Sequence, residues 1–100
     1  MSAVNRLVAL LLLSVATTVE AGDPFKGHHI YTQHCLQCHG EDGSGTMVVI
    51  PSFRRGEGLL QPDYLLAETL KQGLGAMPAY RGLLDDNELA DVITYLRTLQ

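Results

Sequence analysis

The chain of 100 residues contains no tryptophan, only two cysteines, and seven basic residues against eleven acidic ones. The shortage of lysine and arginine, with a net charge of -4, argues against a partner with a phosphate backbone, because nucleic-acid binding depends on clustered basic side chains. The chain also lacks an apolar run of the roughly 20 residues that a membrane-spanning helix needs. Its length permits a single domain.

The densest apolar run, residues 7–16, lies at the start of the chain after Arg6 and is followed by small residues at Val19 and Ala21. A positive charge, a short apolar core and small residues at its end are typical of a secretory signal peptide. We expect cleavage after Ala21, so that residues 1–21 are removed and residues 22–100 form the exported, periplasmic domain. The alternatives are a second cleavage site at Ser14-Val15-Ala16 and an uncleaved membrane anchor.

The mature chain is small for a self-sufficient hydrophobic core, and domains of this size are often stabilised by a disulfide, a metal or a cofactor. Both cysteines lie in one motif, Cys35-Leu36-Gln37-Cys38-His39. The pattern Cys-x-x-Cys-His marks covalent attachment of a c-type haem, in which the two thiols bind the vinyl groups and the histidine binds the iron. The sequence therefore predicts one haem c, held by Cys35, Cys38 and His39.

Three other interpretations of the motif compete with haem attachment. A thioredoxin-like redox pair belongs to a βαβ unit, and no strand pattern precedes Cys35. A structural zinc site needs four ligands, and no histidine occurs after His39. A plain disulfide would leave His39 without a role.

Gly27 and Tyr31, with the haem motif, follow the spacing G-x-x-x-aromatic-x-x-x-C-x-x-C-H. This pattern resembles the first helix of class I cytochromes c. The resemblance implies an all-α fold, in which three main helices surround one covalently attached haem. It also implies that Gly27 and Tyr31 form a close crossing with the last helix, where Tyr95 matches the family's aromatic residue.

Three helices are expected from the pattern of caps and apolar residues. The first begins with Asp23 as N-cap and Pro24 at its first position, and its periodicity continues to Cys38. A middle helix spans residues 62–72 and is stopped by Gly73. Asp85 and Glu88 begin the closing helix with a capping box, and its apolar stripe is Leu89, Val92, Ile93, Leu96 and Leu99.

Met77 is the predicted second axial ligand of the iron. It lies 38 residues after His39 and precedes Pro78, which favours an extended loop, and residues 75–80 resemble the methionine loop of bacterial class I cytochromes. Met47 is the other candidate, but it is expected to fill the core. The resemblance further implies that the carbonyl of Pro51 accepts a hydrogen bond from the His39 ring.

Three more histidines, His28, His29 and His34, are alternative ligands in principle. They share the first helix with the thiols, so we expect them to be surface or fold residues. Arg54 and Arg55 are open to two interpretations. They pair with a haem propionate or a partner's carboxylates, or they are solvated loop residues.

An iron bound by imidazole and thioether has no open coordination position, which favours transfer of single electrons over catalysis. The short mature chain and the ligand loop are similar to the small cytochrome c associated with cytochrome cd-type nitrite reductase in denitrifying bacteria. That resemblance implies electron delivery to the reductase. The alternatives are an accessory role in haem d maturation and a general periplasmic carrier serving another oxidoreductase.

Overall fold

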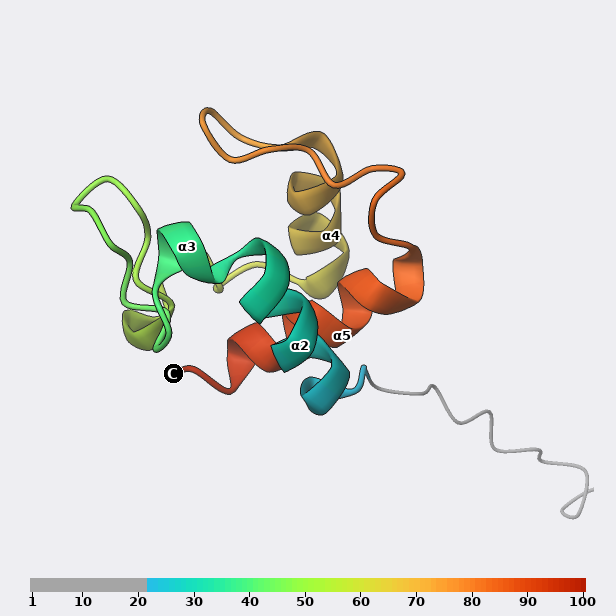
Figure 1. The fold of residues 1–100 in the computed structure, drawn as a ribbon, viewed down its shortest axis with the longest axis horizontal. Coiled ribbons are helices and arrows are strands. Elements are labelled where there is room, and N and C mark those ends of the chain that lie inside the picture. The colour runs from blue at the N-terminus through green and yellow to red at the C-terminus, as the bar shows by residue number, and fades with distance from the viewer. Residues whose placement is uncertain (1–21) are drawn as a thin grey trace, which may run out of the picture.

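The computed structural model describes residues 22–100, which form helices joined by loops (Figure 1). The elements are α2 (Pro24–His34), α3 (Leu36–His39), the 3-10 helix η1 (Phe53–Arg55), α4 (Asp63–Gln72) and α5 (Asp86–Arg97). Extended pairing within residues 22–100 is limited to two isolated bridges. The expected all-α architecture is therefore confirmed, whereas the predicted signal peptide lies outside the described residues and stays a prediction.

Within residues 22–100, no helix combines the length and the apolar character needed to cross a membrane.

Helix α2 begins as predicted but ends earlier than its periodicity indicated. The Asp23 carboxylate accepts hydrogen bonds from the N–H groups of Phe25 and Lys26, and Pro24 occupies the first turn. The helix stops at Cys35, and α3 resumes one residue later. The Cys38 N–H bonds to the Cys35 carbonyl at 3.3 Å, three residues back rather than four. The haem motif is thus divided between the end of one helix and a separate helical turn.

Helices α2 and α5 cross at Gly27 (Figure 1). A Cβ atom built on Gly27 would lie 2.0 Å from the carbonyl oxygen of Asp91 and 2.9 Å from the Cβ of Tyr95. Tyr31 is fully buried, and its ring centroid lies 5.2 Å from that of Tyr95. The predicted crossing of Gly27 and Tyr31 with the last helix, and the place of Tyr95 in it, are confirmed.

Helix α5 packs against both α2 and α4. Asp85 and Glu88 make the predicted capping box, and at the other end Arg97 binds Asp63 at 2.6 Å and the carbonyls of Leu59 and Gln61 at 3.0 Å. These bonds fix the start of α4 against α5. The buried core consists of Ile30, Tyr31, Phe53, Leu59, Leu66, Tyr80, Leu84, Leu89, Val92, Ile93 and Leu96.

Replacing Gly27 with alanine should lower the free energy of unfolding by roughly 2 kcal/mol, because the added methyl group overlaps the α5 backbone. Alanine normally stabilises a helix by up to about 1 kcal/mol relative to glycine, so the sign of the change is itself diagnostic. Denaturant unfolding of the haem-loaded protein, followed by circular dichroism, measures it. Gln33→Ala, on the exposed side of α2, is the control, and a stabilised Gly27→Ala variant would contradict the close crossing.

Candidate haem site

The two cysteines stand where α2 passes into α3. Cys35 is the C-terminal cap of α2 and is half-buried, whereas Cys38 lies on α3 and is exposed. Both are free thiols, which is the form that the predicted attachment to haem uses. Burial, and next the nearby Cys38, raises the pKa of the Cys35 thiol to about 11. Both sulfur atoms remain available for covalent bonds.

His39, at the end of α3, has the properties of a metal ligand. Its ring stacks on Phe53, with the centroids 4.6 Å apart and the planes inclined by 20°. Burial lowers the pKa of the imidazole, which favours the neutral form that binds metals. Its Nδ1 atom is buried without a hydrogen-bond partner among the described residues. Such orphaned buried atoms are rare, and this one fits a histidine prepared to bind iron through its other nitrogen.

The predicted hydrogen bond from the His39 ring to the Pro51 carbonyl is not formed, since Nδ1 has no hydrogen-bond partner within residues 22–100. Pro51 is exposed and begins the short segment that leads to Phe53. The predicted role of Pro51 therefore stays a prediction. Because Phe53 stacks on the ring, the segment that carries Pro51 is nevertheless held beside His39.

The loop over residues 40–52 folds back onto the haem motif. The Gly45 N–H donates to the His39 carbonyl at 2.8 Å, and the N–H and hydroxyl of Thr46 donate to the Cys38 carbonyl at 3.0 and 2.9 Å. Further along, the Phe53 N–H donates to the Gly43 carbonyl at 2.7 Å. These bonds satisfy carbonyls that the short helix α3 leaves free, and they place Phe53 against the His39 ring.

The two loop arginines form ion pairs within the chain. Arg54 binds Asp42 at 3.1 Å and Arg55 binds Glu57 at 2.9 Å, with all four side chains partly or largely exposed. Hydrogen bonds from the hydroxyl and N–H of Ser44, followed by Arg54, lower the pKa of Asp42 to about 2. The structure thus favours the interpretation of Arg54 and Arg55 as loop residues, paired locally at the surface.

The loop that carries Met77 forms a turn closed by backbone hydrogen bonds, and it packs against Gly73 at the end of α4. Leu74 and Met77 exchange two backbone hydrogen bonds, of 3.1 and 3.0 Å. Gly73 has a positive φ of 75°, and a Cβ atom there would lie only 2.8 Å from the Met77 carbonyl oxygen. Met77 itself is half-buried. Its predicted bond to iron stays a prediction. The backbone at Met77 is held by the hydrogen bonds to Leu74 and by the close approach to Gly73.

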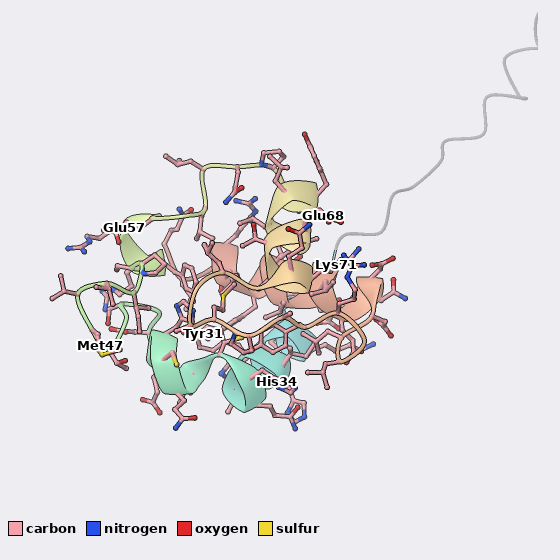
Figure 2. The ribbon with its side chains drawn as sticks, turned by 90° about the horizontal axis from the view of Figure 1, so that it is seen from above. Tyr31, His34, Met47, Glu57, Glu68 and Lys71 are labelled. Atoms are coloured by element: carbon pink, nitrogen blue, oxygen red, sulfur yellow. The ribbon has the colours of Figure 1, made fainter. Side chains whose placement is uncertain are left out.

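Met47 does not fill the core, so that prediction is wrong. Its side chain is 63% exposed in the loop over residues 40–52, which projects beyond the helices (Figure 2). The neighbouring Val48 and Val49 are also exposed, because the loop contacts the haem motif through backbone hydrogen bonds and through the Phe53 side chain.

His28, His29 and His34 are exposed as expected, and His28 packs on Tyr95 with ring centroids 4.9 Å apart.

Two site residues were missed by the sequence reasoning, Phe53 and Tyr80. Phe53 stacks on His39, and Tyr80 donates its hydroxyl to the His34 carbonyl at 2.9 Å. An aromatic residue three positions after Met77 was visible in the sequence. Its contact with residue 34 was not, because that contact joins positions 46 residues apart.

Comparison with known proteins gives consistent similarities. Residues 22–96 match the family model described as cytochrome C oxidase, cbb3-type, subunit III. The FixP subunit of a cbb3-type cytochrome c oxidase from Bradyrhizobium diazoefficiens is 33% identical over 90 residues, covering 87% of this chain and 31% of its own length. Cytochrome c6 of Thermosynechococcus vestitus is 29% identical over 91 residues, covering 86% and 79%.

Among solved structures, cytochrome c6 from the diatom Phaeodactylum tricornutum is similar, with a TM-score of 0.61 and 26% identity. The alignment covers 77% of this chain and 93% of the diatom protein. This chain spans about a third of the length of the oxidase subunits that it matches, but most of the length of the cytochromes c6.

Proposed function

Because the chain belongs to the family of cbb3-type cytochrome c oxidase subunit III, over residues 22–96, we propose that it carries single electrons between periplasmic redox proteins. Its fold is the class I cytochrome c fold, its cofactor is one covalent haem c, and it is an electron-transfer protein rather than an enzyme. The observation that carries the proposal is the single Cys-x-x-Cys-His motif, in which a buried nitrogen of His39 has no hydrogen-bond partner within the described part of the chain.

We assign four residues to the cofactor. Cys35 and Cys38 would hold the haem through two thioether bonds, and His39 and Met77 would bind its iron. When bound, the haem supplies a one-electron iron couple, whose potential is raised by a methionine ligand relative to two imidazoles. With both His39 and Met77 bound, the iron would have no coordination position left for a substrate, which is why electron transfer is the expected activity.

The surroundings of His39 suit rapid electron transfer. Phe53 limits rotation of the imidazole by stacking, and the bonds from Gly45 and Thr46 hold the backbone on either side of it. A ligand that moves little between oxidation states lowers the reorganisation needed for each transfer. Pro51 would complete this arrangement in our proposal, because its carbonyl would accept a hydrogen bond from the Nδ1–H group of His39 in the haem-loaded protein.

The proposed acceptor is a cytochrome cd-type nitrite reductase, supported by the resemblance of the mature length and the ligand loop to its small cytochrome c. The similarity to oxidase subunits supports a second acceptor, a cbb3-type oxidase. Periplasmic location rests on the predicted signal peptide. A haem d maturation role would use the same redox haem for biosynthesis.

The electron-carrier proposal predicts a reversible one-electron titration of the purified protein and no binding of carbon monoxide to its reduced form. Spectroelectrochemistry and a carbon monoxide difference spectrum measure these two properties. Stoichiometric binding of carbon monoxide would contradict a closed iron and favour a sensor or an enzyme.

Deletion of the gene in its source organism distinguishes the candidate partners and roles. Slow nitrite consumption with a fully loaded reductase would identify an electron donor, whereas a reductase without haem d would identify a maturation factor. Normal nitrite reduction with slow oxygen consumption would identify the oxidase as acceptor. No effect on any of the three would favour a general carrier.

A further inference from the structure

Tyr80 joins the methionine loop to the haem motif. Its side chain is 6% exposed, and its hydroxyl donates to the His34 carbonyl at 2.9 Å. The ring also meets the His34 ring edge-on, with centroids 5.8 Å apart. His34 is the last residue of α2 and directly precedes the first cysteine. Tyr80 therefore contacts the residue immediately before the segment that carries Cys35, Cys38 and His39.

The break between α2 and α3 explains why this carbonyl accepts a side chain. In a continuous helix the His34 carbonyl would accept from the N–H four residues later, which belongs to Cys38. That N–H bonds to Cys35 instead, so the His34 carbonyl loses its regular partner. Tyr80 satisfies it. Burial raises the pKa of the Tyr80 phenol, so the hydroxyl keeps its proton and remains a donor at neutral pH.

The backbone of Tyr80 is fixed as firmly as its side chain. Its N–H donates to the Leu70 carbonyl of α4 at 2.9 Å, and its carbonyl accepts from Leu83 and Leu84 at 3.0 Å. Only Pro78 and Ala79 separate it from Met77, and both lie against Gly73. The backbone between Met77 and Tyr80 therefore has little conformational freedom, so a displacement of Tyr80 also displaces Met77.

We propose that Tyr80 is a positioning residue for the methionine ligand, holding the Met77 loop against the haem motif through its bond to His34. The role rests on the proposed ligation of the iron by Met77. A thioether is a weak ligand that exogenous bases displace, so anchorage of its loop decides how often the iron becomes accessible. Loss of the hydroxyl leaves the His34 carbonyl without a hydrogen bond in the closed state, in which Met77 binds the iron. The free-energy cost of moving the loop away from the iron is therefore lower.

Tyr80→Phe tests this role, since it removes the hydroxyl and keeps the ring. We expect the oxidised holoprotein of this variant to bind imidazole about tenfold more tightly than wild type does. In the variant the part-buried His34 carbonyl has no hydrogen-bond partner while the loop is closed, and water can satisfy it when the loop opens. The absorption band of thioether-bound ferric haem should be lost at a lower imidazole concentration. Haem attachment and the circular dichroism spectrum should not change.

Two other tyrosines provide controls. Tyr31 also donates a buried hydroxyl, to the Gly40 carbonyl at the other end of the haem motif, but its bond does not reach the Met77 loop. Tyr64 is exposed on α4. Imidazole affinity in Tyr31→Phe and Tyr64→Phe should stay within about twofold of wild type, even though loss of the Tyr31 bond reduces stability.

The possible results distinguish the positioning role of Tyr80 from the ligation of the iron by Met77. If wild type shows thioether coordination and Tyr80→Phe binds imidazole like wild type, the role of Tyr80 is overturned while the ligand assignment stands. An equal rise in Tyr31→Phe would also overturn it, because the effect would then follow general loss of stability. If wild type shows no thioether coordination and Met77→Ala leaves its spectrum unchanged, both proposals fail.

Discussion

Replacing both Cys35 and Cys38 with serine is expected to abolish covalent haem attachment completely. Serine is close to cysteine in size, and its hydroxyl does not form the thioether bond that joins the protein to a vinyl group. Haem from wild type should stay with the precipitated protein in acidified organic solvent, whereas haem from the double variant should pass entirely into the solvent. The absorbance of the two fractions measures the effect.

The single variants are the matched controls. Cys35→Ser and Cys38→Ser should each retain one thioether bond, so their haem should remain with the protein and show a shifted absorption maximum. Ser44→Cys adds a thiol in the exposed loop and should not restore attachment to the double variant, because it lies outside the motif. Extractable haem in wild type would contradict the assignment of Cys35, Cys38 and His39.

Met77→Ala should produce the second large effect, which is an open iron with a lower reduction potential. Removal of the thioether leaves one axial position to water or an added ligand, so the reduced protein should bind carbon monoxide stoichiometrically. The potential should fall by on the order of 0.1 V, within the roughly 0.8 V range that axial ligands span. Carbon monoxide difference spectra and spectroelectrochemistry measure the two changes.

Met47→Ala is the control for this experiment. Met47 is exposed in the loop over residues 40–52, so its removal should leave the spectrum and the potential unchanged. An unchanged ferric spectrum in Met77→Ala, together with an altered one in Met47→Ala, would transfer the ligand role to Met47. An unchanged spectrum in both would instead indicate that a histidine is the second ligand.

The helices illustrate what local sequence signals predict well. Asp23 before Pro24, and Asp85 before Glu88, satisfy N–H groups within their own first turns. Gly27 marks a close approach that only a residue without a side chain allows. Each of these signals acts over a few residues or follows a spacing shared by the family, so each was readable before the structure.

The errors concern the course of the backbone through the haem motif and through the loop that follows it. The periodicity through Cys38 predicted one helix, but the Cys38 N–H bonds to Cys35 and divides it. Met47 is apolar and was expected in the core, but its loop returns to the haem motif through backbone bonds that leave its side chain outside. Side-chain type alone gives no information about the path of a loop that is fixed by its backbone.

The cofactor chemistry, the helical class and the capped helix starts could be predicted from the sequence, because these depend on residues close together in the chain. Which side chains support the site became evident only from the folded chain. Phe53 reached His39 through the return of a loop, and Tyr80 reached His34 across 46 positions. Such contacts depend on how α2, α4 and α5 pack, and packing is a property of the whole core rather than of any local segment.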